Sequence, residues 1–357
     1  MKHNILFFCP SIEEGGVEKN LFIITNRLSR DNNVFILTAN KNKIKKFNRN
    51  IKFISPKDIS WSNKSRILKA IICVKLLIFN FKIYEYTAIS FQANIIAIIL
   101  FKILKKKIII RCNTSPSSYI RSYLKKLIFK CFYNFADKII VNSYEFKKEF
   151  IHFFKIKSNV IYNPIISFKS KNNNFDLDYL NNKKLKLISV GRLTKIKNHI
   201  TILKALNLIK DQLDFQLIIL GKGNELNNLK KFVNENSLKK KIIFKGYQEN
   251  VKKYINESNV LIHSSKFEGL PNILIEAQLQ KKLIISSNCP TGPREILLNG
   301  LGGYLFNHNN YKQLSNILLN LKKEKKLIKS KIKKSFANLQ RFNLEKNCNK
   351  YEKIILN

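Results

Sequence analysis

The chain has 357 residues, enough for two domains of ordinary size, and a hydrophobic fraction of 45% allows a packed core. It carries 66 Lys and Arg against 23 Asp and Glu, a formal net charge of +43. No stretch reaches the roughly 18 uninterrupted apolar residues typical of a membrane-spanning helix, so an integral membrane protein is not expected.

The positive charge is shared by the two halves. Residues 1–170 hold 31 basic and 9 acidic residues, and the remainder holds 35 and 14. A nucleic-acid footprint is usually a clustered patch, so no nucleic-acid partner is expected. Two explanations stay open: compositional drift on a solvated surface, since Lys, Asn and Ile are all abundant, or selection for an anionic partner, best a membrane surface.

Six cysteines are widely spaced and none forms a C-x-x-C pair, which argues against zinc and disulfide frameworks. Reduced thiols of a cytoplasmic protein fit better. The early apolar run, residues 5–8, is too short for a secretory signal.

Short apolar runs alternate with helical patterns. In the first half we expect strands at 5–9, 34–38, 88–91, 107–111 and 138–142, and a helix at 17–28. The pattern restarts with strands at 185–190, 215–220, 242–245, 260–264 and 283–286, and helices at 200–210, 225–237 and 251–258. This alternation predicts two α/β units with parallel sheets, joined by the polar stretch 163–184.

Two apolar segments with isolated lysines, 67–81 and 93–104, have two interpretations. They are helices that cover a sheet, or one of them presents a basic amphipathic face to anionic lipid.

Polar and glycine residues follow several strands at their carboxyl ends, where open parallel sheets bind ligands. Gly15 and Gly16 open a helix after the first strand, and Gly221 with Gly223 follows 215–220. Glycine allows close approach of the backbone, and a helix start offers donors to an anion. A tight turn before a helix explains Gly15 and Gly16 equally well.

After 185–190 come Gly191, Arg192 and Lys197. Arg192 can bind phosphate with two hydrogen bonds and Lys197 adds a compact charge, so both would stabilise a departing diphosphate. The alternative is that both are solvated surface cations. The Pro/Gly segment 288–295 is either a turn or the rim of a cleft between the two units, on which the residues at the strand ends would converge.

The segment 267–277 is the most informative. Pro271 is favoured at the first helical position, and the amides that follow it suit an anion. Glu268 lies in the preceding loop, and Glu276 lies further along the helix. This arrangement suits a diphosphate, with one carboxylate for a sugar and one for a ribose; two surface acids are the alternative.

Taken together, these segments resemble the retaining glycosyltransferases of family four, which have the GT-B fold: two Rossmann-like domains with parallel sheets facing an interdomain cleft. The matching parts are Gly15-Gly16-Val17-Glu18, Gly191-Arg192 with Lys197-Asn198, Gly221-Lys222-Gly223, Gly246-Tyr247, and Glu268 with Glu276 and the intervening Gly-Leu-Pro-Asn. The resemblance implies an acceptor-binding domain at 1–165, a nucleotide-sugar-binding domain at 166–340, and a terminal helix at 341–357 that returns to the first domain.

The resemblance also implies residue roles. Arg192 and Lys197 would bind the donor diphosphate, Glu276 the ribose, and Tyr247 would lie near the base. The donor sugar would be held by Glu268, which we place closest to the chemistry, and by the backbone of Gly269, Leu270, Pro271 and Asn272. Gly15 and Gly16 would face the phosphates or the sugar, and Gly221 would border the donor.

One departure is the loop after residue 110. Many relatives carry a His there, whereas this chain reads Arg111-Cys112-Asn113. Asn113 or a backbone carbonyl would replace the contact.

The resulting hypothesis is a cytoplasmic retaining glycosyltransferase, peripheral at the inner face of the membrane. It would transfer a hexose or N-acetylhexosamine from a nucleotide sugar, best a UDP-sugar, to a glycan or lipid-linked saccharide in polysaccharide or lipopolysaccharide biosynthesis, without metal or other cofactor. The alternatives are a basic nucleic-acid- or membrane-binding protein without catalysis, and a GT-B nucleotide-sugar epimerase.

Overall fold

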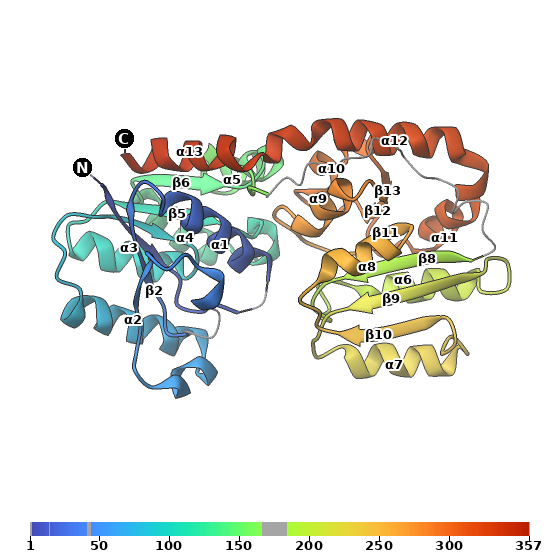
Figure 1. The fold of residues 1–357 in the computed structure, drawn as a ribbon, viewed down its shortest axis with the longest axis horizontal. Helices are drawn as coiled ribbons and strands as arrows, with labels where there is room; N and C mark the ends of the chain where they lie inside the picture. The colour runs from blue at the N-terminus through green and yellow to red at the C-terminus, as the bar shows by residue number, and fades with distance from the viewer. Residues whose placement is uncertain (1, 14, 41–43, 166–183, 357) are drawn as a thin grey trace. The chain divides into compact units, whose positions relative to one another are not determined.

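The computed structural model describes residues 2–13, 15–40, 44–165 and 184–356 (Figure 1). The chain forms two compact units. Unit 1 comprises Met1–Ile166 and Arg341–Asn357, and unit 2 comprises Ser167–Gln340. The expected polar joint at 163–184 lies mostly outside the described residues.

Unit 1 is built on a seven-stranded sheet in the order β3-β2-β1-β4-β5-β6-β7, in which every pairing is parallel. The strands are β1 (Asn4–Phe8), β2 (Asn33–Leu37), β3 (Lys52–Ile54), β4 (Thr87–Ser90), β5 (Ile108–Cys112), β6 (Lys138–Val141) and β7 (Asn159–Val160). The helices are α1 (Gly16–Leu28), α2 (Arg66–Asn80), α3 (Asn94–Ile103), α4 (Tyr123–Asn134), α5 (Tyr144–Phe154) and α13 (Leu344–Leu356).

Alternate strand residues of unit 1 feed two separate cores, as the two-residue period of a strand requires. Leu6 and Phe8 pack with residues of α2 to α5 on one face of the sheet. Ile5 and Phe7 pack with residues of α1 and α13 on the other. The terminal helix therefore belongs to unit 1 and completes one of its two helical layers.

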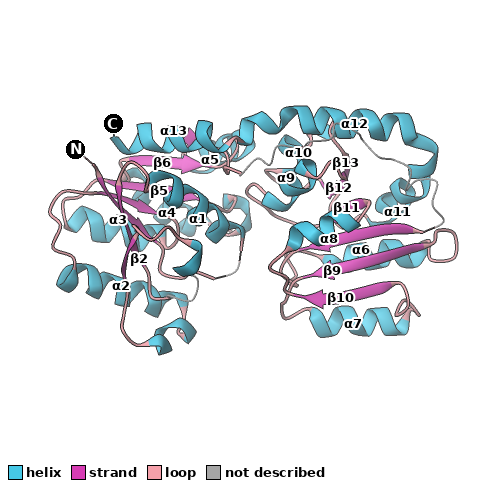
Figure 2. Ribbon diagram, in the orientation of Figure 1, coloured by secondary structure: helices cyan, strands magenta, loops and turns pink. Residues whose placement is uncertain are grey.

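Unit 2 repeats the design with a six-stranded parallel sheet in the order β10-β9-β8-β11-β12-β13 (Figure 2). The strands are β8 (Leu185–Val190), β9 (Phe215–Leu220), β10 (Ile242–Gly246), β11 (Val260–His263), β12 (Leu283–Ser287) and β13 (Tyr304–Phe306). The helices are α6 (His199–Leu208), α7 (Leu226–Glu235), α8 (Val251–Glu257), α9 (Asn272–Leu279), α10 (Pro293–Ile296), α11 (Tyr311–Asn320) and α12 (Lys325–Ala337). The predicted pair of α/β units with parallel sheets is confirmed.

The strands that the sequence analysis missed are the edge strands β3, β7 and β13. They are three, two and three residues long, too short for a periodic pattern to reveal. A smaller difference concerns Pro271, which caps α9 in an extended conformation, so the helix begins at Asn272 rather than at Pro271.

Candidate active site

The expected site residues of unit 2 gather where β8 and β11 end. The loop after β11 is tied to the loop after β8 by two hydrogen bonds: the Ser264 hydroxyl donates to the Lys197 carbonyl at 3.0 Å, and the Lys266 amide donates to the Ile196 carbonyl at 2.8 Å. Residues about 70 positions apart are thereby held side by side.

The centre of this arrangement is the carboxylate of Glu268. Its Oε1 lies 2.5 Å from Lys197 Nζ and 3.0 Å from His263 Nε2. The Glu268 and His263 side chains are 11% and 5% exposed, against 24% for Lys197. Two of the predicted catalytic residues are therefore in direct contact, and their low exposure to solvent strengthens the interaction between their charges.

Burial alone would raise the pKa of Glu268, but the neighbouring Lys197 ammonium and the His263 hydrogen bond outweigh it and hold that pKa well below the usual range. The carboxylate is thus ionised at neutral pH. His263 is oriented from behind, since its Nδ1 lies 3.0 Å from the Ser286 hydroxyl of β12.

The Glu268 backbone is fixed by the loop between β12 and α10. The Thr291 hydroxyl donates to the Glu268 carbonyl at 2.6 Å. A Cβ on Gly292 would lie 2.4 Å from the Gly269 carbonyl oxygen, so only glycine fits there. The Pro/Gly segment 288–295 therefore supports the Glu268 loop.

The glycines after β9 allow two backbone segments to pass close to each other. Gly221 has φ +143°, and a Cβ there would lie 1.9 Å from the Gly191 carbonyl oxygen. A Cβ on Gly223 would lie 2.2 Å from the Leu193 carbonyl oxygen. These contacts bring the β9 loop onto the Gly191-Arg192 turn; a contact of Gly221 with a donor stays a prediction.

Arg192 is exposed and makes no ion pair with any described side chain. Of the two cations expected to bind a diphosphate, one is thus available and the other neutralises Glu268. Glu276 on α9 and Tyr247 after β10 are both half-buried. Gly269, Leu270, Pro271 and Asn272 are buried and lead directly into α9, whose first turn contains no acidic residue. The start of α9 is therefore electrostatically suited to an anion.

Two histidines were missed by the sequence analysis, His263 and His199. His263 ends β11, five residues before Glu268, and only the fold of the intervening loop brings them together. His199 is buried, its Nδ1 lies 3.1 Å from the Ser189 hydroxyl, and burial together with Lys197 lowers its pKa to about 4. It is therefore neutral at pH 7.

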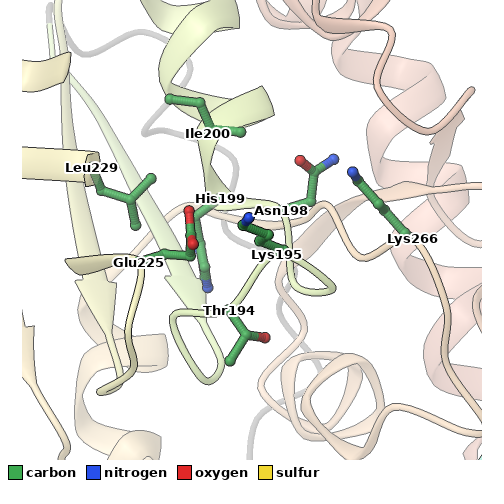
Figure 3. Close-up of a pocket in the computed structure, with 8 residues that line it drawn as sticks. All are labelled: Thr194, Lys195, Asn198, His199, Ile200, Glu225, Leu229 and Lys266. Atoms are coloured by element: carbon green, nitrogen blue, oxygen red, sulfur yellow. The ribbon is translucent and has the colours of Figure 1, made fainter. Parts of the chain in front are cut away.

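A hollow of about 110 Å³ lies within unit 2 (Figure 3). It is lined by Thr194, Lys195, Asn198, His199, Ile200, Glu225, Leu229 and Lys266. None of the residues predicted for the donor is among them, so the hollow is distinct from the Glu268 cluster.

The remaining predicted residues belong to unit 1. Gly15 precedes α1 with an extended backbone, φ −176°, that any residue can adopt. A Cβ there would meet only the Glu18 carboxylate. Gly16 begins α1, and Asn113 donates through Nδ2 to the Phe91 carbonyl at 2.9 Å. That the residues of both units face one cleft stays a prediction.

In the described ranges there is no group of three or more His, Cys, Asp or Glu side chains able to hold a metal ion. Within the same ranges, no helix is long and apolar enough to cross a bilayer.

Sequence comparison relates the chain to glycosyltransferases. The family profile described as glycosyl transferases group 1 matches residues 171–337. An uncharacterized glycosyltransferase of Methanocaldococcus jannaschii is 33% identical over 202 residues, which are 52% of this chain and 48% of that protein. The chain thus spans about half the length of this relative. A 4-alpha-N-acetylgalactosaminyltransferase of Campylobacter jejuni, named for an undecaprenol-linked acceptor, is 27% identical over 68% of each chain.

Solved structures show the same fold over the full length. HepE of Anabaena, in complex with UDP-glucose, superposes with a TM-score of 0.79 at 17% identity, covering 98% of both chains. TarM of S. aureus gives a TM-score of 0.81 at 11% identity over 99% of both chains. Residues 171–337, most of unit 2, therefore match the group 1 glycosyltransferases, and the chain has the GT-B fold.

Proposed function

We propose that the chain is a retaining glycosyltransferase of cell-surface glycan biosynthesis. It transfers a hexose or N-acetylhexosamine from a nucleotide sugar, best a UDP-sugar, to a glycan or lipid-linked saccharide. The observation that carries the proposal is the Glu268 carboxylate, held by Lys197 and His263 just before the α9 N-terminus.

In the proposed reaction an acceptor hydroxyl attacks the anomeric carbon from the face that the diphosphate leaves. The bond from that carbon to the phosphate oxygen breaks as the new glycosidic bond forms. The departing diphosphate oxygen takes the proton of the hydroxyl. Because the hydroxyl attacks the same face that the diphosphate leaves, the anomeric configuration is conserved.

Positive charge for the leaving diphosphate comes from Arg192, Lys197 and the α9 amides, a set that needs no metal ion or other cofactor. Lys197 is already positioned by Glu268. When the donor binds, the Lys197 ammonium contacts the phosphates as well as Glu268. Glu268 holds the sugar hydroxyls, and Glu276 holds the ribose. Gly15, Gly16 and Asn113 of unit 1 stay predicted contacts of the donor.

The names of two relatives support the proposed acceptor class. The C. jejuni enzyme is named for a diphospho-undecaprenol saccharide, and an Erwinia amylovora relative, 27% identical over 249 residues, is named for amylovoran biosynthesis. We therefore propose a lipid-linked or polysaccharide acceptor, and with it a location in the cytoplasm at the inner face of the cell membrane.

The test is donor turnover by Arg192→Ala, Lys197→Ala and Glu268→Ala, assayed as release of UDP from UDP-glucose, UDP-galactose and UDP-N-acetylglucosamine. Each variant should lose about 10²- to 10³-fold in rate, the usual effect of removing one group that stabilises developing charge. The matched control is Lys186→Ala, which removes an exposed lysine from the opposite end of β8 and should leave the rate unchanged. Near-wild-type rates in all three site variants would show that the donor site is wrongly assigned.

The stereochemistry needs its own measurement. Proton NMR of the product of an α-linked donor should show an α-linked sugar, and a β-linked product would exclude retention. Incubation of the donor without acceptor separates transfer from epimerisation, because an epimerase would convert the sugar nucleotide to its isomer. The match of residues 171–337 to the group 1 glycosyltransferase profile disfavours the remaining alternative, a basic binding protein without catalysis.

A further inference from the structure

The outer surface of helices α2, α3 and α4 in unit 1 is unusually apolar. All three helices pack their inner sides into one core through Cys73, Leu77, Ala97, Phe101 and Tyr133. Of the 21 large apolar side chains that are exposed in the described part of the chain, 13 lie between residues 67 and 135. These exposed side chains are therefore concentrated on one helical layer.

On α2 the exposed positions follow the helical repeat. Ile67, Ile71 and Ile78 are 66%, 55% and 55% exposed, and Phe79 is 70% exposed. The first three are four and seven residues apart, so they form one stripe along the helix. The solvent-exposed stripe of α2 is thus as apolar as a helix face that normally packs against a partner.

The same pattern continues on the neighbouring helices. On α4, Tyr123 and Leu124 are 74% and 68% exposed, and Leu127 and Ile128 extend the stripe by one turn. On α3, which contacts α4, Ile103 is 74% exposed. Single exposed apolar residues need no explanation, but a shared face across helices of one layer does.

The charge of this region is equally one-sided. Residues 59–136 contain 14 Lys and Arg but one acidic residue, Glu85. Helices α2, α3 and α4 contain no Asp or Glu. Lys75 on α2 and Lys125 on α4 are exposed among the apolar side chains, as is Arg66, which lies 3.6 Å from Glu13. The even balance between the two halves of the chain conceals this local deficit of acids.

We propose that the outer face of α2, α3 and α4 docks on an anionic lipid bilayer. The apolar side chains enter the boundary between headgroups and acyl chains, and the Lys and Arg side chains contact lipid phosphates. The helices have 15, 10 and 12 residues, too short to cross a bilayer, so they lie in its plane. This inference uses the proposed function only for the location at a membrane.

The composition of this face argues against two other binding partners, a second copy of the chain and nucleic acid. A second copy of the chain would set three helices that contain no acidic residue against the same three helices, and nucleic acid would leave the exposed Ile and Phe side chains without a partner. An anionic bilayer satisfies both the apolar and the basic groups.

The test is co-sedimentation of the full chain with vesicles of phosphatidylcholine alone or mixed with phosphatidylglycerol. We expect strong binding to the mixed vesicles only. Lys125→Glu with Lys126→Glu should weaken that binding by at least tenfold, since each lysine near an anionic surface contributes about 1 kcal/mol. The matched control is Lys239→Glu with Lys240→Glu, an exposed neighbouring pair in unit 2 with the same change in charge, which should stay close to wild type.

The apolar part is tested by Phe79→Trp in a Trp61→Phe background, because Trp61 is the one tryptophan of the chain. Brominated lipids in the mixed vesicles should quench Phe79→Trp and leave Leu327→Trp, placed at a 47%-exposed position on α12, unquenched. Equal quenching at both positions, or equal loss by both lysine pairs, would overturn the proposal.

Two further outcomes would reassign the face. A dimer in solution that Ile71→Gln dissociates would identify a second copy as the occupant, and oligonucleotide binding lost in the lysine variant would identify nucleic acid. UDP release by Lys125→Glu with Lys126→Glu, measured without vesicles, should equal that of wild type. Failure of vesicle binding with normal release would reject the docking face alone, whereas vesicle binding without any UDP release would reject the proposed function alone.

Discussion

The carboxyl ends of the two sheets carry different chemistry although the units share one architecture. In unit 1, the loop after β1 is held by two hydrogen bonds between neutral groups: the Ser11 amide donates to Gln92 Oε1 at 3.1 Å, and Gln92 Nε2 donates to the Ser11 carbonyl at 2.8 Å. Charged side chains join them through single hydrogen bonds, such as that from Gln92 Nε2 to Glu18 Oε1 at 3.1 Å. In unit 2 the same edge holds the ion pair of Lys197 and Glu268, whose atoms are 2.5 Å apart.

Carboxylates are present at the unit 1 edge as well, but their contacts with cations are looser. Lys69 lies 3.8 Å from Glu13, which is 44% exposed, whereas Glu268 is 11% exposed. Solvent weakens the first pair and burial strengthens the second. The tighter and less exposed ion pair therefore lies in unit 2, the unit to which we assign the donor.

The largest expected difference between the edges concerns their glycines. Gly221→Ala should destabilise unit 2 by about 3 kcal/mol or more, because strain at positive φ combines with a clash against the Gly191 carbonyl. Gly15→Ala in unit 1 should cost less than about 1 kcal/mol, since its backbone is extended and the Glu18 carboxylate can move. Differential scanning calorimetry measures both.

Gly246→Ala is the control for strain without a clash, because φ is +67° and no atom lies within 4 Å of the added Cβ. It should cost about 1–2 kcal/mol. A Gly221→Ala variant as stable as Gly246→Ala would mean that the crossing of the two loops is not needed.

The next largest expected effect concerns the buried ion pair of Lys197 and Glu268, whose interaction can be measured separately from the contribution of each side chain. Lys197→Met leaves Glu268 buried without its main cation and should cost about 3 kcal/mol of unfolding free energy at pH 7. Adding Glu268→Gln should recover much of that loss, since the buried charge is then removed. A double-mutant cycle by chemical denaturation gives the coupling, with Lys195→Met as an exposed control.

The same pair predicts a pH dependence. The pKa of Glu268 is depressed in the folded state, so its stabilisation is fully present above the unfolded pKa of about 4.3 and is lost as pH falls through the lower folded value. In Lys197→Met the folded pKa rises because burial then dominates. The cost of the substitution should therefore shrink below about pH 5; a cost that stays constant with pH would show that Glu268 does not sense Lys197.

In unit 1 a buried cation is held by neutral partners, without a carboxylate. Arg111 is 0% exposed, its Nε donates to the Tyr351 hydroxyl of α13 at 2.7 Å, and its Nη2 donates to Asn163 Oδ1 at 2.6 Å. Tyr351→Phe leaves a buried donor unpaired and should cost about 1–3 kcal/mol. Tyr84→Phe, at an 85%-exposed position, is the control. Hydrogen exchange of α13 should accelerate in Tyr351→Phe alone; unchanged protection would show that Arg111 does not anchor the helix.

The sequence predicted most elements within one or two residues because buried parallel strands such as Leu185–Val190 and Phe215–Leu220 are continuous apolar runs. It also singled out Lys197 and Glu268, since glycine and proline mark the loops in which they lie. It did not reveal that they pair, or that His263 joins them. Those contacts depend on how loops about 70 residues apart in the chain fold together, and periodicity carries no information on that.

The smallest expected effect tests whether unit 1 contributes more than shape to the donor site. Asn113 replaces a histidine that the family resemblance implies, and its one hydrogen bond recorded in the structure is to the Phe91 carbonyl at 2.9 Å. Asn113→Ala should therefore cost only about 0.5–1.5 kcal/mol of stability, the usual worth of such a bond. If Asn113 also contacts the donor sugar, UDP release should fall further than this loss of stability explains, while UDP alone binds as in wild type. If UDP release stays normal, the sugar contact comes from a backbone carbonyl of the same loop or from unit 2 alone, and the contrast between the closely ion-paired edge of unit 2 and the looser edge of unit 1 becomes sharper.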